Sequence, residues 1–213
     1  MFTVPAWNYP YLTAVNSVVP ALMAGNAVVI KHSTQTPLCG ERLVECFAAA
    51  GLPSGLCQAL HLDHDETARV VRDPRVDFVA FTGSVGGGRA VQRAAAERFI
   101  GVGLELGGCD PVYVRGDADL AHAIENIVDG AYFNSGQSCC GLQRIYVHAD
   151  VHDAFVRGAA ELVGKYVLGN PLEESTTLGP VVRASAGDAI RAQVQASIAA
   201  GANPLVDERA FAA

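Results

Sequence analysis

The stretch VDFVAFTGSVGGG, residues 76–88, contains the pattern that decides the fold. VDFVAF, residues 76–81, is an apolar run that predicts a strand, and the glycine-rich turn after it leads into a helix over roughly 87–98. The same alternation recurs along the first half of the chain. Further strands are predicted at 27–31, 57–62, 101–106 and 111–114, and further helices between Pro37 and Gly51 and over 65–72.

Strands that alternate with crossover helices predict a parallel sheet covered by helices on both faces. Ligands bind such a sheet beyond the carboxyl ends of its strands. Polar residues stand at those ends here: Lys31 ends the first strand, Thr82, Gly83 and Ser84 follow the third, and Glu105 ends the fourth. We therefore expect a ligand site at this edge of an α/β sheet.

The second half of the chain continues with elements of the same kinds. The apolar stripe over 117–132 predicts a helix, which is followed by a strand at 144–148 and by helices over 151–166 and 183–200. We interpret this region as the beginning of a second α/β domain. The expected organisation is one domain over residues 1–114 and a second, partial domain over residues 115–213.

The composition excludes several classes of protein. The 213 residues are 50% hydrophobic and 17% charged, with a formal net charge of −7 and no basic stripe, so nucleic acid is not an expected partner. The apolar runs fall short of the roughly 18 residues of a membrane helix, and the first residues do not resemble a signal peptide. We expect a soluble, cytoplasmic protein that does not bind a membrane.

The six cysteines are interpreted as free thiols, because a chain of this length without a secretory leader builds its own core. No CxxC pair is present, and no histidine flanks a cysteine at metal-ligand spacing. His61 and His64 stand near two aspartates, but a polar turn after a strand explains them better than a metal does. No metal site is predicted.

Several features are candidates for chemistry, and each has a plainer alternative. The turn TGSVGGGR, residues 82–89, presents backbone N–H groups that suit an anion, but it also reads as a tight turn. Glu105 in GLELGG is either a buried base with a raised pKa or a carboxylate held by the following glycine amides. Asn8, between Trp7 and Tyr9, is either an oxyanion donor or a turn-former.

The most reactive candidate is the adjacent pair Cys139-Cys140 in FNSGQSCC, residues 133–140. A disulfide between adjacent cysteines would be badly strained. A nucleophilic thiol requires partial exposure and an electropositive setting, which backbone amides at the start of an element can supply. The residues alone leave a nucleophile and an inert, buried cysteine both open.

Taken together and in order, five segments resemble those of the aldehyde dehydrogenase superfamily. They are PAWNYP (5–10), VVIKHSTQTP (28–37), FTGS (81–84), LELGG (104–108) and FNSGQSC (133–139). The resemblance extends over nearly the whole chain. It implies a Rossmann-like dinucleotide-binding core without the usual glycine fingerprint, followed by the first part of a catalytic domain that carries the nucleophile.

The resemblance implies a role for each catalytic candidate. Cys139 matches the catalytic thiol, which attacks the aldehyde carbonyl, whereas Cys140 is its variable neighbour. Asn8 and the backbone N–H of Cys139 would hold the oxyanion, and Glu105 would activate the water that hydrolyses the thioester. The implied activity is oxidation of an aldehyde to a carboxylic acid with NAD or NADP.

The resemblance also implies a dinucleotide site. Lys31 matches a lysine near the adenine ribose, and Gly83 and Ser84 match the turn under the pyrophosphate. Many NAD-preferring members carry a carboxylate three residues after that lysine; Thr34 stands there instead and favours NADP, because a hydroxyl does not repel a 2′-phosphate. The expected cofactor-binding residues are Trp7, Lys31, Thr34, Phe81, Thr82, Gly83, Ser84, Gly87, Gly88, Leu106 and Gly107.

The chain departs from the family in length, because family members are much longer. The later Glu-x-Phe-Gly-Pro motif and the arm that builds oligomers are missing, so a homo-oligomer is expected only of a full-length member. Two alternatives to an active dehydrogenase therefore stay open. One is a dinucleotide-binding fragment or one half of a split enzyme, and the other is a thiol hydrolase that uses Cys139 and Glu105 without a cofactor.

Overall fold

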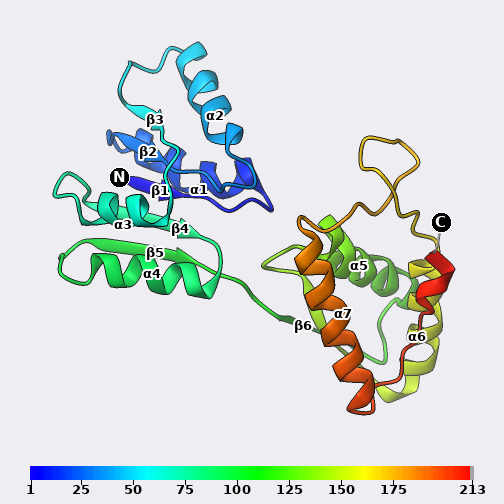
Figure 1. The fold of residues 1–213 in the computed structure, drawn as a ribbon. Helices are drawn as coiled ribbons and strands as arrows, with labels where there is room; N and C mark the ends of the chain where they lie inside the picture. The colour runs from blue at the N-terminus through cyan, green and yellow to red at the C-terminus, as the bar shows by residue number, and fades with distance from the viewer. Residues whose placement is uncertain (212–213) are drawn as a thin grey trace. The chain divides into compact units, whose positions relative to one another are not determined.

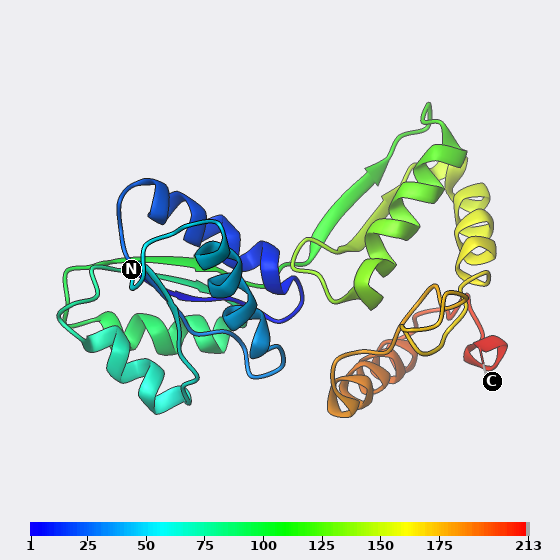
Figure 2. The same ribbon diagram turned by 90° about the horizontal axis from the view of Figure 1, so that it is seen from above.

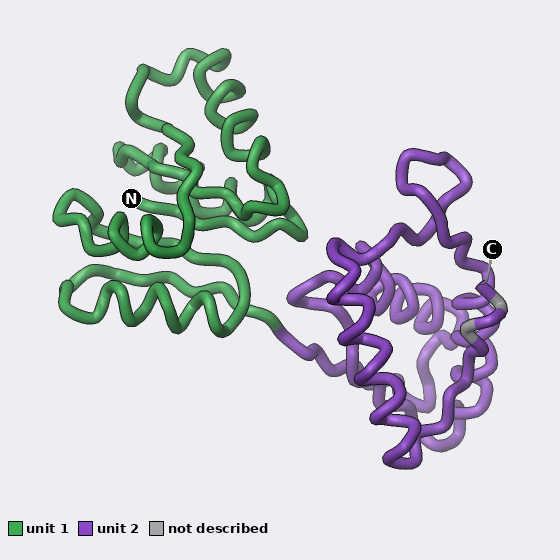
Figure 3. Tube along the Cα trace, viewed as in Figure 1, with its two compact units in different colours: residues 1–107 green, residues 108–213 purple. Residues whose placement is uncertain are grey.

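The computed structural model describes residues 1–211. It divides the chain into two compact units, one formed by residues 1–107 and one that begins at Gly108 (Figure 3). The first unit follows the predicted alternation of strands and helices. Its elements are β1 (Phe2–Val4), α1 (Pro10–Met23), β2 (Val28–Ile30), α2 (Leu38–Ala49), β3 (Cys57–Ala59), α3 (His64–Arg72), β4 (Phe78–Thr82), α4 (Val85–Ala95) and β5 (Gly101–Glu105).

The strands of the first unit form one sheet in the order β3-β2-β1-β4-β5 (Figure 1). All neighbouring pairs are parallel, so the predicted parallel sheet is confirmed. β1 is the central strand: Thr3 is in register with Ile30 of β2 on one side and with Ala80 of β4 on the other. Every residue of β1 is buried, as expected for a strand enclosed on both edges and both faces.

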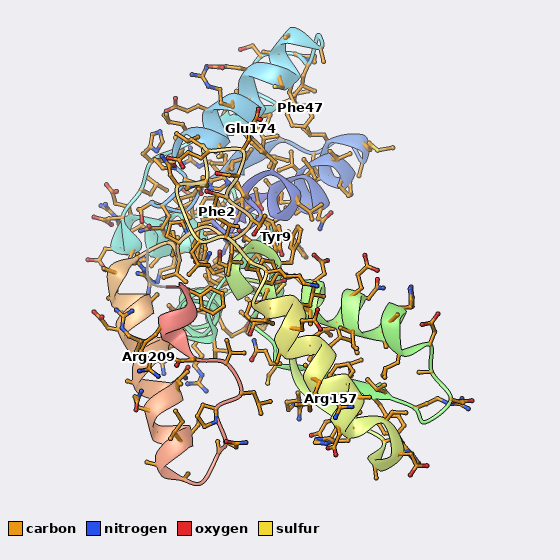
Figure 4. The ribbon with its side chains drawn as sticks, turned by 90° about the vertical axis from the view of Figure 1, so that its right-hand side faces the viewer. Phe2, Tyr9, Phe47, Arg157, Glu174 and Arg209 are labelled. Atoms are coloured by element: carbon orange, nitrogen blue, oxygen red, sulfur yellow. The ribbon has the colours of Figure 1, made fainter. Side chains whose placement is uncertain are left out.

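Helices cover both faces of this sheet, and each face has its own apolar core (Figures 1 and 2). Phe2 and Val79 pack against α3 and α4. Val28 and Ile30 pack against α1 and α2. Phe2, labelled in Figure 4, is fully buried. The expected two-sided covering of the sheet is therefore confirmed.

Helix α1 lies in a stretch for which the sequence predicted no element. Two prolines obscure it. Pro10 occupies its first position, where the missing N–H has no helical partner and the fixed φ suits a helix. Pro20 lies inside the helix, which continues to Met23. A search for prolines as helix breakers therefore misses this element.

The second unit is a smaller α/β arrangement. Its elements are β6 (Asp110–Val114), α5 (Leu120–Tyr132), the 3-10 helix η1 (Phe133–Gly136), β7 (Leu142–Val147), α6 (Ala149–Val163), α7 (Ala184–Ala199) and η2 (Glu208–Phe211). β6 and β7 form a two-stranded parallel sheet joined by the crossover helix α5. Val114, Ile127 and Phe155 form the core between this sheet and helices α5 and α6. None of the helices described over residues 1–211 has the length and apolar character of a membrane span.

The expectation that strand 111–114 continues the first sheet is wrong. β6 pairs with β7 and opens the second unit, so that strand lies beyond the end of the first unit at Gly107. The physical reason is the short connection: only residues 106–109 separate β5 from β6. Two parallel neighbours in one sheet need a crossover of about a dozen residues or more. β6 therefore finds its parallel partner only after helix α5.

His32 joins the end of β2 to the start of α1. It is buried, its Nε2 donates to the carbonyl of Pro10 at 2.9 Å, and its Nδ1 accepts the N–H of Ser33 at 2.9 Å. Because a backbone N–H only donates, Nδ1 carries no proton and the ring is neutral. Burial lowers the pKa of His32 below its ordinary value of 6.5.

The free energy of unfolding of the first unit is expected to fall as the pH drops below about 6.5. Above that pH His32 is neutral in both states, and its contribution is complete. Below it the unfolded chain takes up a proton first, and stability is lost until the pH reaches the lowered pKa of the folded state. Denaturant unfolding, followed through the fluorescence of Trp7, the only tryptophan, measures this change.

A His32→Asn variant is the control, because it keeps a hydrogen-bond acceptor near the Ser33 N–H and removes the titrating ring. The variant is expected to be less stable at neutral pH and to show a flatter pH dependence between about pH 7 and 5. The same pH dependence in both proteins would contradict the assignment to His32.

Candidate functional site

The carboxyl ends of the strands in the first unit lie along one edge of the sheet, because all the strands are parallel. β4 and β5 end together, with Thr82 in register with Glu105. Lys31 follows β2 directly, and the segment that carries Trp7 and Asn8 follows β1. The sheet therefore brings to one edge the polar residues that the sequence places at strand ends.

The strand order reverses at β1. From β1 the chain proceeds outward to β2 and β3, and it then returns to the other side of β1 to form β4 and β5. The helices that leave β1 and β4 consequently pack on opposite faces, α1 on one and α4 on the other. Sheets of this kind bind their ligands at such a reversal, outside the carboxyl ends of the two strands.

A cavity of about 210 Å³ lies in this part of the first unit, lined by residues of α3 and α4 and of the ends of β1, β2 and β4. Lys31, Phe81, Ser84 and Gly87 line it, as four of the predicted cofactor-binding residues. Sequence reasoning missed the other lining residues, which are Val4, His64, Thr67, Ala68, Val71, Ala90, Val91 and Ala94. Val4 lies on β1, and the other seven lie on α3 and α4 at a spacing that is typical of a core face. The one available signal was the run of small residues on α4, which leaves space.

Lys31 brings a buried positive charge to this cavity. Only 6% of its surface is exposed, and burial lowers the pKa of its ammonium group below the ordinary 10.5. Among the described residues no carboxylate offsets this effect. A buried cation is costly without a partner, so this position suits a ligand that brings hydroxyl or anionic oxygens.

The N-terminus of α4 has hydrogen-bond donors beside Ser84 and Gly87, two of the residues that line the cavity. Ser84 is the N-cap, and its Oγ accepts the N–H of Gly87 at 3.1 Å. Over residues 1–211, the N–H groups of Val85 and Gly86 meet no protein acceptor. Together with the partial positive charge of the helix N-terminus, these donors favour an anionic group.

Close contacts oppose a side chain at the glycines of this turn. A Cβ at Gly83 would lie 2.8 Å from Cζ of Phe81, and a Cβ at Gly87 would lie 2.5 Å from the same atom. A Cβ at Gly88 would lie 2.8 Å from Cδ2 of Leu106. Neither Phe81 nor Leu106 could keep its place beside larger residues. Five of the predicted cofactor-binding residues therefore pack together where β4 leads into α4, with Leu106 contacting Gly88 from the segment after β5.

The other predicted residues of the first unit do not line the cavity. Trp7 and Asn8 are half-buried between β1 and α1. Thr34 is exposed in the turn that follows Lys31, and Gly107 is exposed after β5. Their roles stay predictions.

Glu105 is exposed at the end of β5. Of the two alternatives left open for Glu105, a buried base does not hold in this structure. β5 is an edge strand of the sheet, so its last residue has a neighbouring strand on one side only. The carboxylate is accessible to water and to a ligand at this edge.

In the second unit, the backbone before Cys139 adopts an unusual conformation. Asn134, Ser135 and Gly136 have φ angles of 52°, 58° and 74°, all in the left-handed region. This region is unfavourable for residues other than glycine, by about 1–2 kcal/mol each. A loop of this kind persists only where surrounding contacts hold it.

Hydrogen bonds to a distant segment provide these contacts. Ser135 Oγ donates to the carbonyl of Gly179 at 2.6 Å, and the side-chain oxygen of Gln137 accepts the N–H of Val182 at 2.7 Å. Gln137 Nε2 also donates to the carbonyl of Asn134 at 3.0 Å. The loop before Cys139 is thus clamped to residues 179–182. Sequence reasoning did not assign a role to Gln137 or to Ser135.

Cys139 and Cys140 are the two central residues of the turn that follows. The N–H of Gly141 donates to the carbonyl of Ser138 at 3.3 Å and closes this turn. Both cysteines are exposed, and both are free thiols. The alternative of an inert, buried cysteine therefore does not hold for Cys139, and the first requirement of a reactive thiol is met.

Gly108 packs directly against the backbone of Cys139. A Cβ at this position would overlap the carbonyl oxygen of Cys139, so glycine alone permits the approach. Gly108 is the last residue of LELGG, and Cys139 is the last residue of FNSGQSC. The ends of two motifs that are distant in the sequence are therefore in contact within the second unit.

Comparisons with known proteins identify what this arrangement is similar to. A family model described as "Aldehyde dehydrogenase family" matches residues 1–212. A succinate-semialdehyde dehydrogenase (NADP+) of Mycolicibacterium paratuberculosis is 37% identical over 202 residues, which cover 95% of this chain and 43% of that protein. A 3,6-anhydro-alpha-L-galactose dehydrogenase of Streptomyces coelicolor is 40% identical over 197 residues, which cover 92% of this chain and 40% of that protein.

Solved structures of aldehyde dehydrogenases also match this chain. The structure of 3,6-anhydro-L-galactose dehydrogenase in complex with NAP matches with a TM-score of 0.88 at 32% identity, covering 95% of this chain and 43% of that one. Succinic semialdehyde dehydrogenase from Streptococcus pyogenes, in complex with NADP+, matches with a TM-score of 0.91 at 28% identity, covering 96% and 45%. The chain spans less than half the length of the curated relatives described above.

Gly108→Ala is expected to lower the free energy of unfolding by about 1–3 kcal/mol, because the new methyl group overlaps the Cys139 carbonyl and forces the backbone apart. It is also expected to change the rate at which iodoacetamide labels Cys139. Thermal unfolding by circular dichroism and peptide-resolved labelling measure the two effects.

Gly107→Ala is the matched control, because no atom lies within 4 Å of the Cβ it would add. This variant is expected to unfold and to label at Cys139 like the unmodified chain. Equal effects of the two substitutions would show that the contact with Cys139 is not what constrains residue 108.

Proposed function

The chain belongs to the aldehyde dehydrogenase family, and on that premise we propose that it supplies the dinucleotide site and the nucleophile of an enzyme that oxidises an aldehyde to a carboxylic acid with NAD or NADP. The observation that carries this proposal is the exposed thiol of Cys139, held at the tip of a turn against Gly108 and clamped through Gln137. Holding a nucleophile in a fixed place is what covalent catalysis requires.

In the proposed reaction, the thiolate of Cys139 attacks the carbonyl carbon of the aldehyde and forms a thiohemiacetal. The side-chain amide of Asn8 and the backbone N–H of Cys139 donate to the oxygen on which negative charge develops. Loss of a hydride from the same carbon leaves a thioester on Cys139. Glu105 removes a proton from water, which attacks the thioester, releases the carboxylic acid and restores the thiol.

The cofactor in this proposal is a nicotinamide dinucleotide, which accepts the hydride when bound. Lys31 is proposed to hold the adenine ribose, and the start of α4 after Ser84 is proposed to hold the pyrophosphate. The buried ammonium group, the N–H groups of Val85 and Gly86, and the cavity of about 210 Å³ support this assignment. The first unit is then the dinucleotide-binding domain, and the second carries the nucleophile.

We further propose that NADP is preferred. Thr34 presents a hydroxyl where a carboxylate would repel a 2′-phosphate, and it is exposed in the turn after Lys31. The names of the mycobacterial relative and of the Streptococcus pyogenes structure both include NADP+, which supports this preference. The proposed substrate is a small-molecule aldehyde. The full-length enzyme is proposed to be a homo-oligomer that works in the cytoplasm and binds neither nucleic acid nor a membrane.

A second candidate function is a dinucleotide-binding module, either alone or as one half of a split enzyme. The observation that favours it is the first unit, which by itself forms a five-stranded parallel sheet with a cavity lined by Lys31 and the start of α4. Such a module binds NADP and does not turn over aldehyde. Formation of NADPH from NADP and succinate semialdehyde by the purified chain would exclude it, and NADP binding without turnover would support it.

Cys139→Ala is expected to abolish the fastest phase of labelling by a limiting dose of iodoacetamide, because the most reactive thiol is gone. Any aldehyde-dependent NADPH formation is expected to be lost as well, whereas NADP binding persists, since Lys31 and the start of α4 are unchanged. Peptide mass mapping, absorbance of NADPH and calorimetry measure the three quantities.

Cys140→Ala is the matched control at the neighbouring position, and it is expected to keep the fast labelling phase on Cys139. If the fast phase follows Cys140, or spreads evenly over the six cysteines, the assignment of the nucleophile is wrong.

Thr34→Glu is expected to weaken NADP binding at least about tenfold, which corresponds to about 1.4 kcal/mol, because a carboxylate repels the 2′-phosphate. NAD binding is expected to change little. Calorimetric titration of both dinucleotides measures the two affinities.

Thr34→Gln is the control of similar size without the charge, and it is expected to leave the ratio of the two affinities near that of the unmodified chain. A Thr34→Glu chain that binds NADP as tightly as before would remove Thr34 from the specificity argument.

A further inference from the structure

We propose that Cys109 is a resolving thiol for Cys139, so that mild oxidation by a peroxide joins the two residues in a reversible disulfide. This inference rests on the proposed function, because it needs Cys139 to be the reactive thiol. It concerns a residue that lies outside the catalytic and cofactor-binding sets described above. The consequence would be a nucleophile that is protected from irreversible oxidation.

The contact between Gly108 and Cys139 brings Cys109 into place. Gly108 lies so close to Cys139 that a Cβ there would overlap the Cys139 carbonyl oxygen. Cys109 is the next residue along the chain, and consecutive Cα atoms are about 3.8 Å apart. Cys109 is therefore held near the turn that carries Cys139.

The strand register also places Cys109 beside the turn formed by residues 138–141. Asp110 of β6 is in register with Leu142 of β7, and neighbouring strands lie about 4.8 Å apart. Cys109, the residue before β6, therefore lies next to Gly141, which is the last residue of that turn and the second residue after Cys139. A disulfide needs Cα atoms about 4.4–6.8 Å apart, and the contact of Gly108 with Cys139 is what brings Cys109 toward Cys139.

The backbone of Cys109 is fixed, and its thiol is accessible. The guanidinium of Arg144 on β7 donates through Nε to the carbonyl of Cys109 at 3.1 Å. Cys109, Cys139 and Cys140 are all exposed and free. In the described part of the chain no three side chains of the His, Cys, Asp and Glu types converge on a metal position, so these thiols do not form a metal site.

Cys109 is a better partner for Cys139 than Cys140 is. A disulfide between adjacent residues closes a strained ring. A disulfide between Cys109 and Cys139 crosses between two chain segments that are already held together. The geometry therefore favours the pair of Cys109 and Cys139.

The chemistry balances with a peroxide as the oxidant. The thiolate of Cys139 attacks one oxygen of hydrogen peroxide, the O–O bond breaks, and a sulfenic acid and hydroxide form. The thiol of Cys109 then attacks the sulfenic sulfur, the S–O bond breaks, and a disulfide and water form. Two thiols lose two electrons in total, and one peroxide is reduced to two waters.

Tryptic mapping of the full 213-residue chain tests the proposal directly. Cleavage after Arg98, Arg115 and Arg144 gives one peptide, 99–115, that contains Cys109 alone, and another, 116–144, that contains Cys139 and Cys140. After treatment with one equivalent of hydrogen peroxide, the two peptides are expected to be joined and to separate again with dithiothreitol.

Three variants identify the sulfurs. Cys140→Ser is expected to keep the link between the two peptides, whereas Cys139→Ser and Cys109→Ser are expected to lose it. When the Cys109→Ser chain is treated with excess hydrogen peroxide, a second peroxide is expected to oxidise the sulfenic acid of Cys139 to sulfinic acid, so that recovery of Cys139 by dithiothreitol falls by about fivefold or more relative to the unmodified chain under the same treatment. Cys109→Ser leaves the proposed catalytic residues unchanged.

The outcomes separate this inference from the proposed function. If Cys139 labels rapidly with iodoacetamide but, under peroxide, pairs with Cys140 or reaches sulfinic acid while Cys109 stays reduced, the resolving role of Cys109 is overturned alone. If Cys139 labels no faster than the other cysteines, the proposed nucleophile is wrong, and this inference falls with it.

Discussion

The pairing of β1 with both β2 and β4 is the constraint on which the first unit depends. β1 spans only Phe2–Val4, and Thr3 also joins it to α1 through a 2.8 Å hydrogen bond with the hydroxyl of Ser17. β2 and β4 lie on opposite sides of β1, and both are parallel to it. The helices that make these parallel connections therefore pack on opposite faces of the sheet. The position of the cavity, which is lined by both Lys31 and the start of α4, follows from this arrangement.

Much of the fold could be predicted from the sequence, because apolar runs and glycine-rich turns act locally. The failures occurred where a local pattern was not enough. Strand 111–114 has the composition of a first-sheet strand, and its place was decided by the four residues before it, which are too few for a crossover. Glu105 lies among apolar residues, but the edge position of β5 exposes it.

The candidate site was only partly predictable for a similar reason. The motifs gave Lys31, Ser84 and Cys139, whose residue types are unusual at strand ends and in a turn. They did not give Thr67 or Ala68, which look like any other residues on the inner face of a helix. They also did not give the partners of Ser135 and Gln137, because hydrogen bonds to residues more than forty positions away leave no local pattern.

The contact of Phe81 with the turn after β4 couples the substitutions that evolution can make at positions 81, 83 and 87. Neither Gly83 nor Gly87 has a left-handed backbone, so the phenyl ring, and not the conformation, is what opposes a side chain at either position. A lineage that keeps the ring accepts a larger residue at position 83 or 87 only if the ring shifts. A lineage that first replaces the ring with a smaller side chain removes that obstacle at both positions at once.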